Sequence, residues 1–305
     1  MLSEKMIEER QTTVFNSHCD AIVNTVNCKG VMGAGLALEF RLRYPEMFLQ
    51  YEEDCRNGVV RIGELRTYRV DDSTLIVNFP TKDHWKEPSE YWYIEEGLDY
   101  MMAHYREWNI SSIALPPLGC SNGHLDLDIV RRIIKEKLKD IQIDVVICIG
   151  PDYPEGKEKE MVENYNKSNL MFVCDFLGIT PKSKTILVSN GNIRRFYDIV
   201  SLDGVGLTTY EKLFGLFYRN DDKILEELRK KMTKSYNGSN HDSVCNELNI
   251  KGKMKKIILN HPKIESFEEI SRIEGITNAV YRKLFDFFID YEPKQTPNRV
   301  QSTLC

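Results

Sequence analysis

Two segments of the chain carry residue types that could bind and act on a phosphorylated ligand. In the first, a short apolar strand pattern ends in Asn24 and Asn27, and Gly30, Gly33 and Gly35 then lead into a helical pattern. Glycine lets a backbone approach a ligand closely, and a helix N-terminus attracts an anion such as a diphosphate. The sequence therefore predicts an anion-binding loop, which comprises Met32, Gly33, Ala34, Gly35 and Leu36.

A lysine and a second glycine-flanked turn follow two further strand patterns. Lys82 comes after the apolar run 74–79 and Pro80, so we expect it at the mouth of a sheet. Burial lowers the pKa of a lysine, which can then act as a nucleophile or base; the alternative is an ordinary surface lysine. The second turn, together with the first loop, fits the ligand crevice that forms at the carboxyl ends of adjacent parallel strands. It comprises Pro117, Gly119, Cys120, Ser121, Asn122 and Gly123.

The composition is that of a folded globular protein. The 305 residues are 42% hydrophobic and 29% charged, and no run approaches the roughly 18 apolar residues of a membrane span. Eight scattered cysteines form no CxxC pair and no cluster with zinc-ligand spacing, so we expect free thiols, no metal and no redox cofactor. Cys28 and Cys120 lie in the expected site and stay open as alternative nucleophiles. We expect a cytoplasmic protein that does not associate with membranes.

Alternating strand and helix patterns predict an α/β domain over residues 1–179. Its fold class is a mixed, mostly parallel sheet flanked by helices. We expect buried strands at 20–26, 74–79, 112–115 and 144–149, with further strands at 12–15 and 65–70. Helical patterns occur at 36–56, 90–108, 126–139 and 155–166.

A smaller, mostly α-helical domain is expected after a break in the pattern at 178–184. We assign it residues 185–292, with a short strand at 185–188 and an aperiodic tail at 293–305. Residues 180–305 hold 21 basic and 16 acidic residues, whereas residues 1–179 hold 20 basic and 30 acidic ones. Basic regions attract phosphate backbones, so nucleic acid would bind to this second domain.

The second domain contains an internal repeat with a spacing of 71 residues. The residues Ile193, Phe196, Ile199, Gly204, Tyr210, Lys212, Leu213, Phe214 and Phe217 recur as Ile264, Phe267, Ile270, Gly275, Tyr281, Lys283, Leu284, Phe285 and Phe288. Each copy predicts a helix, a glycine turn and a second helix, and so resembles a helix-hairpin-helix motif. That resemblance implies contact with backbone phosphates in nucleic acid through Gly204, Gly206, Lys212, Gly275 and Lys283. The alternative is a structural repeat, or a protein-binding one, whose aromatic residues form a core.

Three segments in order, 20–37, 78–85 and 115–123, resemble a macro domain, and most closely the branch that contains the DarG-type antitoxins, which remove ADP-ribose from DNA. The resemblance covers roughly residues 5–175. It implies that Asp20, with Ala21 and Ile22 beside it, binds the adenine, and that Asn27 orients the distal ribose. The two glycine loops would hold the diphosphate, while Asn24 braces the first of them.

The same resemblance implies that Lys82 is catalytic and traps the opened sugar as a Schiff base. Thr81, His84 and Trp85 would form the rim, and His124 is a weaker candidate for carrying a proton. Related domains that cleave esters pair the lysine with an aspartate where this chain has Gly123, which favours a nucleic-acid adduct.

We therefore expect a hydrolase that removes ADP-ribose from a modified nucleic-acid base, with DNA as the favoured nucleic acid. Its role would be that of an antitoxin or a repair enzyme. Its partners would be ADP-ribose or ADP-ribosylated nucleic acid and a cognate ADP-ribosyltransferase toxin. Two alternatives stay open. One is a non-catalytic module that binds ADP-ribose, and the other is an antitoxin that sequesters its toxin through the C-terminal domain.

Overall fold

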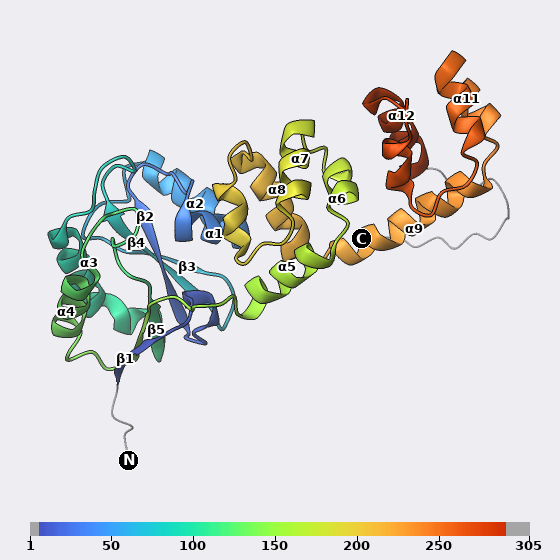
Figure 1. Ribbon diagram of the computed structural model, residues 1–305. Coiled ribbons are helices and arrows are strands. Elements are labelled where there is room, and N and C mark those ends of the chain that lie inside the picture. The colour runs from blue at the N-terminus through green and yellow to red at the C-terminus, as the bar shows by residue number, and fades with distance from the viewer. Residues whose placement is uncertain (1–5, 291–305) are drawn as a thin grey trace. The chain divides into compact units, whose positions relative to one another are not determined.

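The computed structural model describes residues 6–290, and the expected tail at 293–305 lies outside them. The chain divides into two compact units between Glu160 and Met161 (Figure 1). This division lies before the break at 178–184 on which the sequence-based boundary rests, because the helices around that break all belong to the second unit. Within residues 6–290, no helix combines the length and apolarity needed to cross a membrane.

The first unit is built on a six-stranded sheet in the order β1-β6-β5-β2-β4-β3. The strands are β1 (Ile7–Arg10), β2 (Ala21–Asn27), β3 (Arg66–Arg69), β4 (Leu75–Lys82), β5 (Ser112–Leu115) and β6 (Asp144–Cys148). Only the β3–β4 pair is antiparallel among these neighbours, which confirms the mixed, mostly parallel sheet. The carboxyl ends of five parallel strands therefore meet at one edge.

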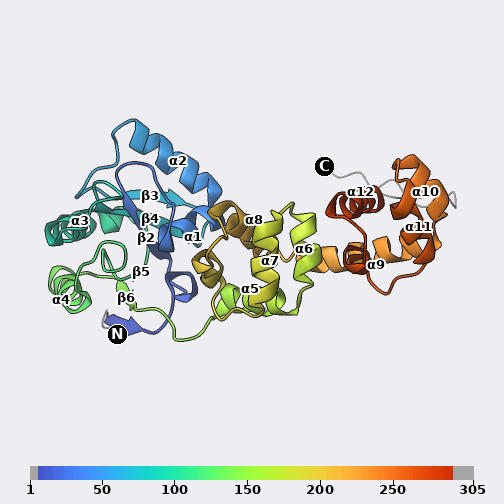
Figure 2. The same ribbon diagram turned by 45° about the horizontal axis from the view of Figure 1, so that its top comes forward.

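Helices cover both faces of this sheet, and each face has its own apolar core. The helices α1 (Gly35–Arg43) and α2 (Pro45–Arg56) lie on one side, and α3 (Tyr91–His104) and α4 (Leu127–Lys137) on the other (Figure 2). Alternate residues of β2 separate accordingly: Ile22 packs with Phe40 of α1, whereas Val23 packs with Leu98 of α3.

Two local expectations for the first unit were wrong. The expected strand at 12–15 is a single 3-10 turn, η1 (Val14–Asn16), because Thr12 and Thr13 donate hydrogen bonds to the Glu155 carboxylate and not to a strand. The first strand is β1, whose charged pattern suits the sheet edge that it occupies. The expected helix 36–56 is split at Tyr44, because a residue before proline disfavours the helical conformation.

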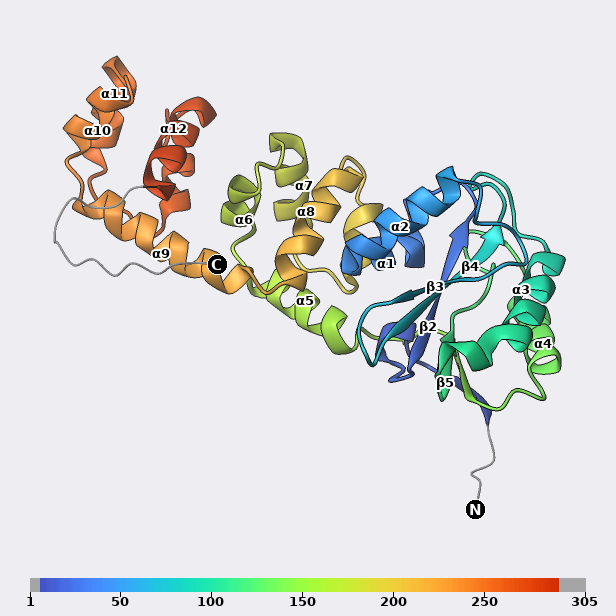
Figure 3. The same cartoon turned by 180° about the vertical axis from the view of Figure 1, so that it is seen from behind.

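The second unit consists of helices in two copies. After α5 (Gly156–Lys167) come α6 (Leu170–Phe176), α7 (Pro181–Asn190), η3 (Phe196–Ser201) and α8 (Leu207–Tyr218). After α9 (Asp222–Gly238) come α10 (His241–Glu247), α11 (Gly252–Asn260), η4 (Phe267–Arg272) and α12 (Asn278–Ile289) (Figure 3). The elements α6 and α10, η3 and η4, and α8 and α12 begin and end 71 residues apart. The short strand expected at 185–188 is wrong: it lies in α7, which Thr180 caps and Pro181 begins.

The duplication reaches further toward the N-terminus than the sequence pattern indicated. Asn166 exchanges two hydrogen bonds with the backbone of Ile193, at 2.9 and 3.0 Å, and Asn237 does the same with Ile264, at 2.9 Å each. We call these side-chain-to-backbone pairs the asparagine clasps. Each copy also has an aromatic core in which a tyrosine meets two phenylalanines. These are Tyr165, Phe196 and Phe217 in the first copy and Tyr236, Phe267 and Phe288 in the second.

Candidate active site

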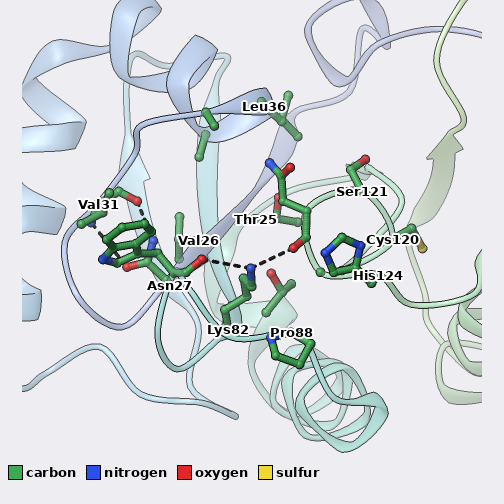
Figure 4. Close-up of a pocket in the computed structure, with 18 of the residues that line it drawn as sticks. Thr25, Val26, Asn27, Val31, Leu36, Lys82, Pro88, Cys120, Ser121 and His124 are labelled. Atoms are coloured by element: carbon green, nitrogen blue, oxygen red, sulfur yellow. Dashed lines mark hydrogen bonds between the residues drawn. The ribbon is translucent and has the colours of Figure 1, made fainter. Parts of the chain in front are cut away.

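A pocket of about 630 Å³ lies at the carboxyl ends of β2, β4 and β5 (Figure 4). It lies where the order of the strands predicts a ligand crevice for a parallel α/β sheet. Its lining residues come from the strand ends, both glycine loops and the segment after Lys82. They are residues 25–27, 31, 33–37, 81, 82, 85–88, 116, 117 and 119–124.

An irregularity between β2 and β4 brings Asn27 and Lys82 level with each other. The register runs from Ala21 opposite Leu75 to Val26 opposite Pro80, and then places Asn27 opposite Lys82. Thr81 is the additional residue, and Pro80 beside it has no amide proton to give to the ladder. Bulges re-aim side chains in this way next to functional sites. Without the shift, Asn27 would be opposite Thr81.

The amine of Lys82 is held by two backbone carbonyls. Its Nζ donates to the carbonyl oxygen of Trp85 at 3.1 Å and to that of Asn122 at 2.8 Å. No carboxylate within residues 6–290 forms an ion pair with it. Desolvation by burial lowers the pKa of Lys82 below its usual 10.5. The amine is thus easier to deprotonate than that of a surface lysine.

Asn27 is buried and its side chain is engaged by the first glycine loop. Its Nδ2 donates to the carbonyl oxygen of Val31 at 2.6 Å, and its Oδ1 accepts from the amides of Lys29 and Val31. Asn24 lies deeper, where its Nδ2 donates to Oδ1 of Asn78 at 2.9 Å. Both asparagines therefore brace the first loop, Asn24 through the sulfur of Met32, and only Asn27 also lines the pocket.

The two glycine loops close over the pocket from opposite sides. In the first loop, Gly35 has a φ of +55° at the start of α1. A Cβ on Gly35 would lie 3.1 Å from Nδ2 of Asn122, which belongs to the second loop. The second loop is fixed to the start of α3, because the amide of Ser89 donates to the carbonyl oxygen of Gly123 at 3.0 Å.

The structure brings most of the expected site residues together at this pocket. They are Asn27, Gly33, Ala34, Gly35, Leu36, Thr81, Lys82, Trp85, Pro117, Gly119, Cys120, Ser121, Asn122, Gly123 and the weaker candidate His124. Met32 is buried in the core beneath the first loop, where its sulfur accepts from Asn24. His84 stacks on Trp85 outside the lining set.

Asp20, Ala21 and Ile22 do not lie at the pocket, which corrects their expected role. They are at the amino end of β2, and a seven-residue strand separates that end from the pocket by about 20 Å. The carboxylate of Asp20 accepts from the amide and the hydroxyl of Ser111 at 2.6 Å each, so it fixes a loop at the far edge. Ala21 and Ile22 are core residues.

The two cysteines near the pocket are poor nucleophiles. Burial raises the pKa of Cys120 to about 11 and that of Cys28 to about 12. Thiols with such pKa values are protonated at neutral pH, and the thiolate is the reactive form. Lys82 is therefore the better candidate of the three.

Sequence reasoning missed several residues of the pocket wall. Lys86, Glu87 and Pro88 continue the segment after Lys82, and Thr25 and Val26 precede Asn27. Their only signal in the sequence was their position beside the motifs, since their residue types indicate no chemistry of their own.

Comparison with known proteins identifies the first unit. The family model described as "Macro domain" matches residues 23–134. This part of the chain is a macro domain. Both glycine loops and the lysine between them lie within the match, and of the segments that suggested it only residues 20–22 fall outside.

Two curated relatives have names that describe an activity. The "DNA ADP-ribosyl glycohydrolase" of Mycobacterium tuberculosis is 44% identical over 162 residues, which are 52% of this chain and 45% of that protein. A "DNA ADP-ribosyl transferase-DNA ADP-ribosyl glycohydrolase fusion protein" of Thermosipho africanus is 30% identical over 154 residues, 45% of this chain and 40% of that protein. The chain thus spans less than half the length of these relatives.

A solved structure, "Macrodomain of Mycobacterium tuberculosis DarG", is 42% identical in sequence. It matches 47% of this chain and 97% of that chain with a TM-score of 0.45.

Proposed function

We propose that this chain is a hydrolase that removes ADP-ribose from a modified nucleic-acid base, and that the nucleic acid is DNA. We propose that it acts as the antitoxin to an ADP-ribosylating toxin. The observation that carries the proposal is the partly desolvated Lys82 at the carboxyl edge of a macro-domain sheet, between two glycine loops. The names of the relatives support DNA as the carrier of the ADP-ribose.

Each part of the pocket has a role in this reaction. The glycine loops and the N-terminus of α1 bind the diphosphate, and Asn27 orients the distal ribose. The neutral amine of Lys82 attacks the anomeric carbon, the bond to the base breaks, and the base leaves with the bonding electrons and takes up a proton. The amine loses a proton, and its lone pair then forms the C=N bond as the bond from the anomeric carbon to the ring oxygen breaks. The ring oxygen keeps that electron pair and takes up a proton, which leaves the open sugar as a Schiff base. Water then hydrolyses the Schiff base to free ADP-ribose and Lys82.

The test compares wild type, Lys82→Ala and Lys82→Arg on an ADP-ribosylated single-stranded oligonucleotide. We expect both variants to lose release of ADP-ribose by at least about 100-fold, while their affinity for free ADP-ribose stays within about 3-fold of wild type. Binding without release by the wild type would contradict the hydrolase and support a non-catalytic module that binds ADP-ribose.

We further propose that the helical unit contacts the nucleic acid through its hairpins. Supporting this, each copy has two hairpins of one kind, joining α6 to α7 and η3 to α8, and α10 to α11 and η4 to α12. Each has one residue of positive φ, namely Gly178, Gly204, Asn249 and Gly275. Exposed lysines, Lys182 and Lys253, occupy the second position of α7 and of α11, which are equivalent in the two copies.

The two lysines that the sequence predicted as phosphate contacts, Lys212 and Lys283, have internal partners. Lys212 donates to the carbonyl oxygen of Leu177 at 2.8 Å, and Lys283 to that of Leu248 at 3.1 Å, so both lysines join α8 or α12 to the neighbouring hairpin. Thr277 caps α12 through the amide of Val280, whereas Gly206 of the first copy makes no such side-chain cap. We therefore assign the stronger phosphate contact to the first copy.

Binding of the full chain to unmodified single-stranded DNA tests this second proposal. We expect affinity to fall with rising salt and to fall further in the double variant Lys182→Glu, Lys253→Glu. The matched control is Lys231→Glu, Lys234→Glu, which reverses two exposed charges on α9. Equal losses of affinity in the two double variants would contradict a role for the hairpins. They would leave only non-specific electrostatic attraction between the basic unit and DNA.

A cognate transferase and a cytoplasmic location complete the proposal. The fusion relative, by its name, combines a transferase and a glycohydrolase in one chain, which supports a transferase partner for this chain. The cysteines among residues 6–290 are free thiols, which supports a reducing compartment.

A further inference from the structure

An exposed tryptophan stands at the wall of the pocket. Trp85 lies in the segment between β4 and α3 and lines the pocket, yet its side chain is 47% exposed. Tryptophan is usually largely buried, so it is the combination of exposure and a place in the pocket wall that distinguishes Trp85. Its ring is placed to contact what the pocket binds.

The segment that presents Trp85 is fixed on both sides. The amide of Cys28 donates to the carbonyl oxygens of Lys82 and Asp83 at 3.1 Å each. A turn follows, in which the amide of Glu87 donates to the carbonyl oxygen of His84 at 3.0 Å, and Ser89 is bonded to the second glycine loop. The indole is therefore presented by a preorganised loop, which reduces the entropy lost on binding.

Trp85 lies directly beside the amine that would react. Its carbonyl oxygen accepts from Nζ of Lys82 at 3.1 Å, so a group that leaves the sugar at Lys82 emerges next to this residue. The ring of His84 stacks on the indole at a centroid distance of 5.6 Å, and Nζ of Lys86 lies 4.9 Å from the indole centroid. Lys86 is an exposed, flexible side chain that an incoming ring can displace.

The charges around Trp85 are unsuitable for holding a long phosphate backbone. Asp83, Glu87 and Glu90 are exposed within this segment; Lys29 is paired with Asp83 at 3.2 Å, which leaves Lys86 as a cation against Glu87 and Glu90. A contact here must therefore use the face of a base more than its phosphate, because the acidic side chains repel phosphates.

We propose that Trp85 stacks on an unpaired nucleobase that flanks the modified base, and that it thereby selects single-stranded nucleic acid. The inference rests on the proposed hydrolase function. Bases in a duplex are stacked on each other and expose no face, whereas an unpaired base offers its face to an aromatic ring. Such stacking tolerates any base, so the selection is for strand state and not for sequence.

The experiment measures kcat and KM on three substrates that carry the same ADP-ribosylated base. These are the modified mononucleoside, a modified single-stranded pentanucleotide, and a longer modified oligonucleotide annealed to its complement. The variants are Trp85→Ala, Trp85→Phe and the control Trp92→Ala, which removes a 50% exposed tryptophan that does not line the pocket.

We expect Trp85→Ala to raise KM for the pentanucleotide about 10-fold more than it raises KM for the mononucleoside. Trp85→Phe should restore most of the loss, and Trp92→Ala should behave as wild type. The loss should be nearly the same at low and high salt, because a stacked base carries no charge to the contact.

Three results would overturn the proposal. The first is an equal loss on mononucleoside and pentanucleotide, which would place Trp85 against the sugar or the target base. The second is equal activity of the wild type on single strand and duplex, and the third is equal losses in Trp85→Ala and Trp92→Ala. If the wild type releases ADP-ribose from none of the substrates, the hydrolase proposal fails separately. The affinities of the same ligands for the same variants then test the stacking.

Discussion

At the scale of single residues, the site depends on how Lys82 is held. Two backbone carbonyls accept hydrogen bonds from its amine, and partial burial lowers its pKa. An ion pair with a carboxylate would raise the pKa of Lys82 and keep its amine protonated. The two carbonyls hold the amine without such a pair. The environment of Lys82 therefore suits a nucleophile better than a permanent cation.

The pH dependence of the reaction follows from this lowered pKa. In the proposed reaction the neutral amine is the reactive form, so we expect kcat/KM to rise with pH and to level off below pH 10.5, the usual lysine value. A pH profile of kcat/KM on the mononucleoside substrate measures the midpoint of this rise. If the rise in kcat/KM has its midpoint at or above pH 10.5, then either Lys82 is fully solvated in the free enzyme or another group controls the rise.

At the scale of elements, loop backbones determine the shape of the pocket. A Cβ on Gly123 would lie 2.2 Å from Oγ of Ser89 and 2.3 Å from the carbonyl oxygen of Gly119, so the second loop has no room for a side chain there. A Cβ on Gly33 in the first loop would meet only Val31, at 3.7 Å. The two glycines therefore differ in how strictly the fold requires them.

These contacts predict that one alanine substitution lowers stability and that another leaves it nearly unchanged. Gly123→Ala should lower stability by about 1–3 kcal/mol and weaken ADP-ribose binding, because the loop must move away from Ser89 and Gly119. Gly33→Ala, the matched control, should leave stability within about 0.5 kcal/mol of wild type. Thermal unfolding and calorimetric titration with ADP-ribose measure both effects. Similar losses in both variants would contradict this account of the second loop.

Much of the site could be predicted from the sequence, because its residues follow apolar strands directly. Strand patterns with glycines after them place both loops and Lys82 at one sheet edge. The direction of β2 could have excluded Asp20, since the amino end of a strand cannot reach a pocket at its carboxyl end. The register shift at Thr81 could not be read from the sequence, because it depends on how β2 and β4 pair.

At the scale of the whole chain, the second unit is a duplicated helical module, and one of its copies carries a titratable group in its core. His241 is 8% exposed at the start of α10, its ring lies 4.4 Å from that of Tyr236, and its Nε2 has no hydrogen-bond partner within residues 6–290. The position 71 residues earlier is Leu170. Burial lowers the pKa of His241.

This lowered pKa makes the second copy sensitive to acid. The unfolded chain binds a proton at His241 more readily than the folded one, so stability is complete above about pH 6.5 and falls as pH drops toward the folded pKa. Hydrogen exchange of α9–α11, compared at about pH 5 and about pH 7 after correction for intrinsic rates, measures the effect. His241→Leu, which copies the first module, should remove it. An equal acid response in the variant would assign the sensitivity to other groups.

The asparagine clasps give the duplicated module a property beyond its folding. Because each copy closes its own loop with its own asparagine and fills its own aromatic core, neither relies on the other for these contacts. Substitutions can therefore accumulate at the hairpin of one copy, as Thr277 opposite Gly206 illustrates, while the other keeps its original surface. Because the two copies are independent in this way, one copy can acquire a new binding specificity while selection still maintains the binding specificity of the other.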